Sequence, residues 1–136
     1  MTSSEARRAF ATGLVLVLGL GLSGCGAHDA DPGAVEFQVA VGDETFVMRA
    51  TDPETVRLAV DRLGGRNRRF PIGPLLRGDG AFNAPWSWRL DPAEVRLTEA
   101  AVEVCDGTPS YVEAHLEDFA ASGYCPWSAR IVGVRP

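Results

Sequence analysis

Residues 35–50 read VEFQVAVGDETFVMRA, and this stretch decides the fold of the chain. Within 35–41, apolar side chains alternate with polar or small ones, which is the period of a strand with one buried face. Gly42 and Asp43 suit a two-residue hairpin turn, and residues 44–50 continue the alternation. The stretch therefore predicts two antiparallel strands that present one apolar face to a core.

The signals of a helix follow this hairpin directly. Residues 51–54 (TDPE) supply a capping side chain, a proline suited to a first turn and an acid near the positive end of the helix dipole. An apolar stripe follows at Val56, Ala59, Val60 and Leu63. Gly64-Gly65 then predicts the end of the helix.

The middle of the chain predicts shorter and less regular elements. Two prolines interrupt the apolar run of 70–77, which suits an edge strand or an irregular extension because proline cannot donate to a ladder. Residues 81–90 begin as a loop and become a strand. In 95–104 the apolar positions change phase near Thr98-Glu99, which predicts a strand with a bulge or bend. A helix over 93–101 is the competing interpretation.

The C-terminal part predicts a second helix and a last strand. The helix begins near Thr108-Pro109 and ends at Gly123, and residues 127–134 alternate as a strand. The resulting order is β-β-α-β-β-β-α-β. It predicts an α+β domain in which two helices pack against one mainly antiparallel sheet.

The N-terminus has the features of a bacterial lipoprotein precursor. Arg7 and Arg8 precede an uncharged stretch, residues 9–24, and Ser23-Gly24 stand directly before Cys25. A transmembrane helix is the alternative, but it needs about 20 apolar residues, and this stretch is shorter and rich in glycine. We expect cleavage before Cys25, lipid attachment to its thiol and amine, and an extracytoplasmic protein anchored in the cell envelope.

These signals divide the chain into three parts. Residues 1–24 are the expected signal peptide, 25–33 the lipidated N-terminus and tether, and 34–136 a single α+β domain. The chain has a net charge of −5, which argues against nucleic-acid binding because that function uses a basic face.

Cys105 and Cys125 are the two cysteines that remain once Cys25 is lipidated. Outside the cytoplasm such a pair most often forms a disulfide, which would stabilise the domain by roughly 3 kcal/mol on the chain-entropy model. A metal site or a redox pair is the alternative. The chain offers no Cys-x-x-Cys element or histidine cluster to support either, so we expect a structural disulfide, with no metal and no cofactor.

Three blocks of sequence carry a family resemblance. They are PWSWRLDP at 85–92, EVCDGTPSYVE at 103–113 and YCPWSAR at 124–130. In this order they resemble the N-terminal domain of the seventy-four-kilodalton calmodulin-binding protein family, over about residues 35–134. The resemblance implies a small, disulfide-linked domain of secreted or membrane-linked proteins, without a known catalytic mechanism. Calmodulin is a eukaryotic cytosolic protein, so we do not expect it as a partner of an envelope lipoprotein.

His115 is the one candidate for catalysis within the domain. It lies on the second predicted helix, with Tyr111 and Asp118 four and three residues away. Ser87 or Ser110 could supply a nucleophile, but no nucleophile elbow or oxyanion element accompanies them. We therefore interpret His115 as a hydrogen-bonded residue at the edge of the core.

Four carboxylates are candidates for a calcium or hydrolytic site: Asp91, Glu103, Asp106 and Glu113. Calcium takes six to eight oxygens from a compact loop, whereas these residues are dispersed along the chain. Asp106-Gly107-Thr108-Pro109 first predicts a turn that caps a helix. We expect no metal site.

Aromatic side chains offer the better candidates for a binding surface, because they give a large contact area for little loss of entropy. The candidate binding residues are Asn83, Trp86, Trp88, Arg89, Asp106 and Trp127. Trp86 and Trp88 share strand parity, so one of them can also belong to the core. In the family that this chain resembles, His often replaces Arg89, so any metal role of that position is in doubt here.

The function that we expect is that of a non-enzymatic binding module. Its partner would be an unknown envelope or extracellular protein or polymer, bound through the loop from Asn83 to Trp88 and its surroundings. A small hydrolase that uses His115 and nearby carboxylates is the first alternative. A small extracellular protease inhibitor is the second.

Overall fold

The computed structural model describes residues 31–101 and 104–136 of the chain. The predicted signal peptide, the lipidation site Cys25 and the tether up to residue 30 lie outside these described residues. The elements, in chain order, are β1 (Val35–Val41), β2 (Glu44–Ala50), α1 (Pro53–Leu63), β3 (Phe70–Ile72), β4 (Leu75–Arg77), β5 (Trp88–Leu90), β6 (Arg96–Thr98), α2 (Pro109–Ala114), α3 (Leu116–Ser122) and β7 (Arg130–Arg135).

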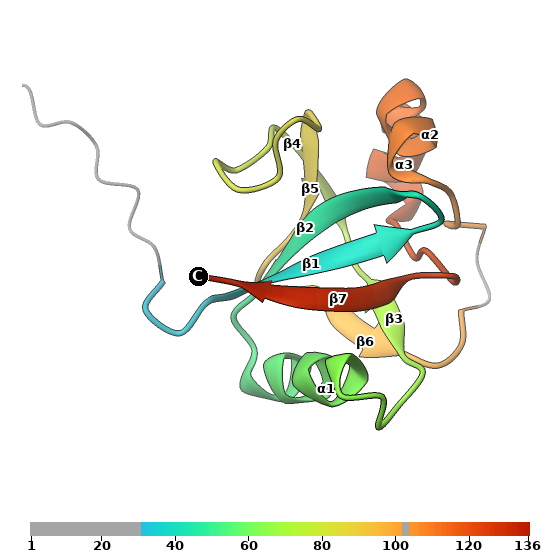
Figure 1. The fold of residues 1–136 in the computed structure, drawn as a ribbon. Helices are drawn as coiled ribbons and strands as arrows, with labels where there is room; N and C mark the ends of the chain where they lie inside the picture. The colour runs from blue at the N-terminus through green and yellow to red at the C-terminus, as the bar shows by residue number, and fades with distance from the viewer. Residues whose placement is uncertain (1–30, 102–103) are drawn as a thin grey trace, which may run out of the picture.

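The strands form three separate antiparallel sheets. The largest has the order β2-β1-β7, and two-stranded ribbons pair β3 with β6 and β4 with β5 (Figure 1). The α+β class and the antiparallel pairing are confirmed. The prediction of one sheet was wrong in detail, because the short strands between 70 and 98 pair only with one another.

The hairpin of β1 and β2 has the predicted register and buried face. Val39 lies opposite Phe46 and Phe37 opposite Met48, and all four side chains are buried. The turn contains Gly42 at φ +62°, a conformation that favours glycine.

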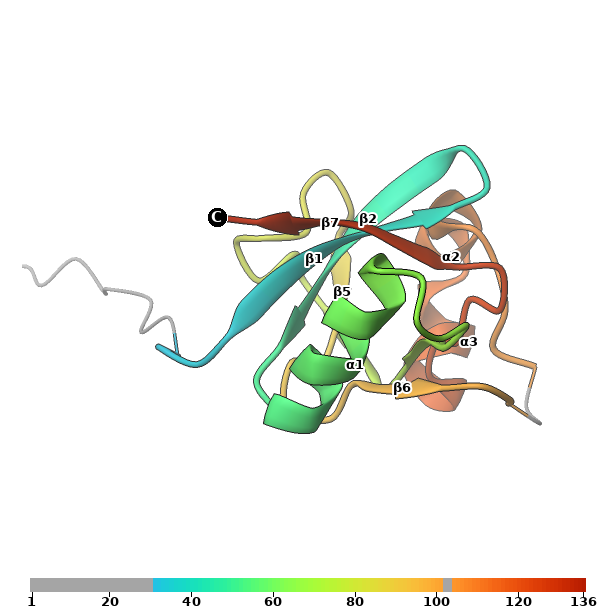
Figure 2. The same ribbon diagram turned by 60° about the horizontal axis from the view of Figure 1, so that its bottom comes forward.

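Helix α1 begins and ends where the sequence predicts. The Asp52 carboxylate accepts hydrogen bonds from the backbone N–H and the hydroxyl of Thr55, and both bonds lower the pKa of Asp52. At the other end, the Gly64 N–H donates to Val60 O. Figure 2 shows α1 between β6 and the β7 side of the three-stranded sheet.

The second predicted helix is two helices in the structure. His115 has φ −131° and ψ 38°, which ends α2 and lets α3 begin in a new direction. As a result α2 packs against β2, whereas α3 packs against β4. A single apolar stripe in the sequence predicts only the buried face and does not reveal this break.

The region after β5 is less regular than expected. The helix considered over 93–101 is not formed, and β6 ends at Thr98, where the phase of the apolar residues changes. Val102 and Glu103 lie outside the described residues. Among the described residues, no helix has the length and the apolar composition that a membrane span requires.

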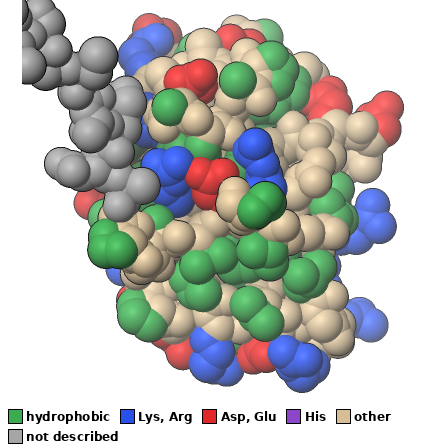
Figure 3. Space-filling model, turned by 60° about the vertical axis from the view of Figure 1, so that its left-hand side comes forward, with side chains coloured by type: hydrophobic (Ala, Val, Ile, Leu, Met, Phe, Trp, Pro, Cys, Tyr) green, Lys and Arg blue, Asp and Glu red, His purple; other side chains and the backbone are tan. Residues whose placement is uncertain are grey.

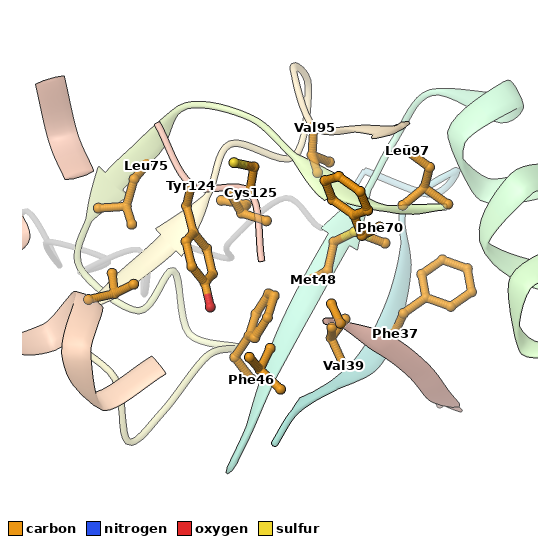
Figure 4. Packing of buried hydrophobic residues seen from close by; sticks show 14 of the residues in the cluster. Phe37, Val39, Phe46, Met48, Phe70, Leu75, Val95, Leu97, Tyr124 and Cys125 are labelled. Carbon is orange, nitrogen blue, oxygen red and sulfur yellow. The ribbon is translucent and has the colours of Figure 1, made fainter. Parts of the chain in front are cut away.

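The core lies between the three-stranded sheet and the elements that cover its inner face. Figure 4 shows buried side chains from several elements, labelled Phe37, Val39, Phe46, Met48, Phe70, Leu75, Val95, Leu97, Tyr124 and Cys125. Phe46 and Tyr124 approach each other with ring centroids 5.6 Å apart, and both approach Trp88. This aromatic cluster joins β2, β5 and the segment after α3.

Candidate binding surface

The predicted binding loop mainly closes one edge of the three-stranded sheet. Asn83 is fully buried, its Oδ1 accepts the Val47 N–H at 2.7 Å, and its Nδ2 donates to Trp88 O at 2.7 Å. Both polar ends of the amide therefore satisfy the backbone of this chain. Asn83 cannot contact a partner directly, so its place among the candidate binding residues is corrected to a structural one.

The two neighbouring tryptophans have different surroundings. Trp88 is fully buried against Phe46 and Tyr124, which removes it from direct contact with a ligand. Trp86 is half-buried, its ring stacks on Trp88 at 6.3 Å, and its Nε1 donates to Thr45 O at 2.8 Å. Trp86 is therefore the tryptophan of this loop that keeps an accessible surface.

Arg89 holds a neighbouring turn. Its Nη1 donates to Arg77 O at 2.6 Å and to Gly78 O at 2.9 Å, which fixes the connection after β4. The guanidinium is thus engaged by carbonyl groups of its own hairpin, and the side chain is half-buried.

The disulfide predicted between Cys105 and Cys125 is formed. Beside it, the Cys125 N–H donates to Cys105 O at 2.8 Å, and the Trp127 N–H donates to Asp106 Oδ1 at 3.0 Å. Trp127 is 52% exposed. The bridge and the carboxylate together fix the backbone that carries this exposed indole.

Asp106 does not cap the following helix, as its sequence context predicts. Thr108 is the N-cap residue of α2, and its hydroxyl accepts the Tyr111 N–H at 3.3 Å. Asp106 instead binds the second disulfide-linked segment through Trp127.

An open hollow of about 220 Å³ lies beside α2 and α3. Its lining includes Asp106, Tyr111, His115, Asp118 and Ser122. The Tyr111 and His115 rings are stacked with centroids 4.1 Å apart, and Tyr111 is 52% exposed. Sequence reasoning names Tyr111 only as a neighbour of His115, although their i,i+4 spacing is the available signal for this pair.

The hydrogen bonds around His115 are structural ones. Its Nδ1 contacts Tyr111 O at 2.8 Å, so Nδ1 carries the proton, because a carbonyl only accepts. The Ser122 hydroxyl donates to Asp118 O of its own helix. Within 31–101 and 104–136, no hydrogen bond joins a serine hydroxyl to His115.

The other candidate catalytic residues are engaged elsewhere. The Ser87 N–H and hydroxyl donate to the Glu113 carboxylate, and the Ser110 N–H and hydroxyl donate to that of Glu44. Asp91 accepts the Ala93 N–H in a turn. Glu103 lies outside the described residues.

The described residues contain no group of three or more His, Cys, Asp or Glu side chains placed to hold a metal ion. Burial raises the pKa of the Tyr124 hydroxyl, with smaller contributions from Asp106 and Glu44, and this hydroxyl donates to Gly107 O at 2.8 Å. Tyr124 is thus a neutral hydrogen-bond donor that holds the turn before α2.

Comparison with known proteins follows from this arrangement of disulfide, tryptophans and short strands. A family model for the N-terminal domain of the seventy-four-kilodalton calmodulin-binding protein matches residues 31–136. The chain belongs to this family. No curated protein and no solved structure matches it.

Membership of this N-terminal domain family confirms the resemblance seen in the sequence, and the match covers the whole described domain. It assigns no binding role to individual residues. The roles of Trp86, Asp106 and Trp127 in recognition therefore stay predictions.

Proposed function

We propose that this chain is an extracytoplasmic binding module of a bacterial envelope, attached to the membrane through lipid on Cys25. The small residues before Cys25 and the uncharged stretch ahead of them support the anchor. The disulfide supports an oxidising compartment, because such bonds are rare in the cytoplasm.

The observation that carries the binding role is a pair of exposed aromatic residues on rigidly held backbone. Trp127 and Tyr111 are each 52% exposed. The Cys105–Cys125 bridge and the Asp106 carboxylate hold the segment of Trp127, while Tyr111 stacks on His115. Exposed aromatic side chains that need little ordering are efficient contacts for a partner.

Photocrosslinking in intact cells tests this proposal. A photoreactive amino acid in place of Trp127 should capture a specific envelope partner, identified by mass spectrometry. The matched control places the same group at Glu94, which is also solvent-facing but lies on the connection between β5 and β6. Capture from both positions alike, or from neither, would count against a binding surface at Trp127.

The anchor is tested separately. Cys25→Ser should abolish labelling with radioactive palmitate and move the protein from the membrane fraction to the soluble one. If the substituted chain stays in the membrane fraction, the lipid anchor is refuted while the binding surface is still open to test.

A small hydrolase is the second candidate, because the hollow brings His115 together with Asp106 and Asp118. A His next to carboxylates can act in general acid–base catalysis. A hydrolytic activity that is lost in His115→Ala but retained in Trp127→Ala would favour this candidate over the binding module.

A further inference from the structure

The last strand leaves one edge of the three-stranded sheet open. β7 pairs with β1 on one side, and no described element pairs with its other side. Outside the sheets, none of the backbone–backbone hydrogen bonds of the described residues involves 130–135. An extended chain with unpaired backbone groups is a template for another strand.

Apolar side chains accompany this open edge. Val132 is 45% exposed and Val134 is 50% exposed on β7, and α1, which packs against β7, contributes Val60 at 43% exposed. Figure 3 shows hydrophobic side chains gathered on this side of the molecule, at the height at which Figure 1 places β7 and α1. Exposed apolar groups beside an unpaired strand are suited to cover a partner.

The register assigns each side chain of β7 to a face. Val134 lies opposite Phe37 and so shares the core face of the sheet, the face on which α1 packs. Arg130 and Arg135 lie opposite Ala40 and Glu36, on the other face. Arg130 and Arg135 share this face because the register shifts between Gln38 and Val39.

The charges on this edge define the complementary partner. β7 contains two arginines and no acid. Arg130 is exposed and takes part in no ion pair or side-chain hydrogen bond within 31–101 and 104–136, and Arg135 Nη1 lies 3.8 Å from the partly buried Glu36. A cationic strand flanked by exposed valines favours a strand that alternates acidic and apolar residues.

We propose that β7 is a docking edge for an extended, acidic segment of a partner protein, which adds a fourth strand to the sheet. Its apolar residues would lie toward Val134 and Val60, and its acids toward Arg130 and Arg135. A second copy of this chain is disfavoured, because antiparallel pairing of two β7 strands centred on this segment sets Arg130 against Arg135. The proposal uses none of the residues of the aromatic surface around Trp127.

Hydrogen exchange and NMR on the full-length chain in detergent micelles test this edge. The probe is a capped peptide of sequence EVTVEVT, and its counterpart KVTVKVT reverses the charge. The acidic peptide should slow amide exchange within 130–135, and the basic one should not. Arg130→Glu should weaken binding of the acidic peptide about tenfold and improve binding of the basic one.

The matched control is Arg96→Glu, the same change of charge on exposed Arg96 of β6. It should alter the affinity less than about twofold. Binding with equal affinity for both peptides, protection outside 130–135, or no protection at all would overturn the proposal. So would sedimentation that shows a dimer already protecting 130–135 before peptide is added, because the second copy would then occupy the edge.

Discussion

The two outer edges of the three-stranded sheet differ in how the chain covers them. At the β2 edge, Asn83 accepts the Val47 N–H and Trp86 donates to Thr45 O, so loop side chains take the place of a neighbouring strand. At the β7 edge, the described residues supply no such partners to 130–135. One edge is therefore completed within the chain, and the other is left to solvent or to a partner.

This difference changes the meaning of the tryptophan-rich loop. The sequence predicts that residues 83–88 bind a partner, yet most of their polar groups satisfy the backbone of β2 and β5. Aromatic and amide side chains in a loop are thus as consistent with covering a sheet edge as with recognition. The surfaces that stay available are the one around Trp127 and the open β7 edge.

The strongest way to break the closed edge is Asn83→Leu. The substitution keeps the approximate volume but leaves the Val47 N–H and Trp88 O without partners in a buried position. Because each unpaired buried group costs about 1–3 kcal/mol, the free energy of unfolding should fall by about 3 kcal/mol. Urea denaturation followed by circular dichroism measures this change.

The control for this variant is Gln38→Leu, which removes an exposed amide from the neighbouring strand β1. Its free energy of unfolding should change by less than about 0.5 kcal/mol. Equal losses in both variants would show that the buried amide of Asn83 has no special role in closing the edge.

Tyr124→Phe tests the aromatic cluster beneath the closed edge. The variant loses the hydroxyl that donates to Gly107 O, and the free energy of unfolding should fall by about 1 kcal/mol at neutral pH. Burial raises the pKa of Tyr124 above its ordinary value of 10.0. The unfolded chain therefore releases this proton first, and its contribution to stability, fully present below about pH 10, is lost as the pH rises further.

Tyr124→Phe should consequently reduce the alkaline loss of stability, as measured by thermal unfolding between about pH 9 and pH 11. Tyr111→Phe is the matched control, because Tyr111 is 52% exposed. A Tyr111 variant with the same change in pH dependence would contradict the assignment to Tyr124.

The parts of this fold that the sequence predicts are those fixed by local patterns. The alternation in 35–50 predicts the hairpin, and the capping signals at 51–54 predict α1. The two remaining cysteines predict the disulfide, because the choice of partners is reduced to one. Each of these rests on neighbours in sequence or on a single possible pairing.

The features that the sequence does not predict depend on distant contacts. Asn83 and Val47 are 36 residues apart, and nothing in either segment indicates that one completes the other. The break at His115 follows from packing of α2 and α3 against different strands. For the candidate site, the sequence predicts Asp106 and Trp127, whereas Tyr111 emerges only once the helix direction places it beside the hollow.

Trp86→Phe sharpens the comparison by a smaller step. It keeps a ring on the loop but removes the hydrogen bond to Thr45 O, which lies near solvent. The free energy of unfolding should fall by about 0.5 kcal/mol, because water can replace the lost donor. In Trp127→Phe, the exposed indole should be replaced without measurable loss. The opposite order in urea denaturation would show that Trp86 does not help to close the β2 edge.

The smallest effect is expected at the open edge. Arg130 is exposed and makes no ion pair or side-chain hydrogen bond within the described part of the chain, so Arg130→Ala should change the free energy of unfolding by less than about 0.5 kcal/mol. The same substitution should weaken binding of an acidic strand, because binding alone uses this charge. Urea denaturation and peptide titration on one preparation separate the two quantities. A large loss of stability would mean that Arg130 serves the fold, and the difference between the two edges would then disappear.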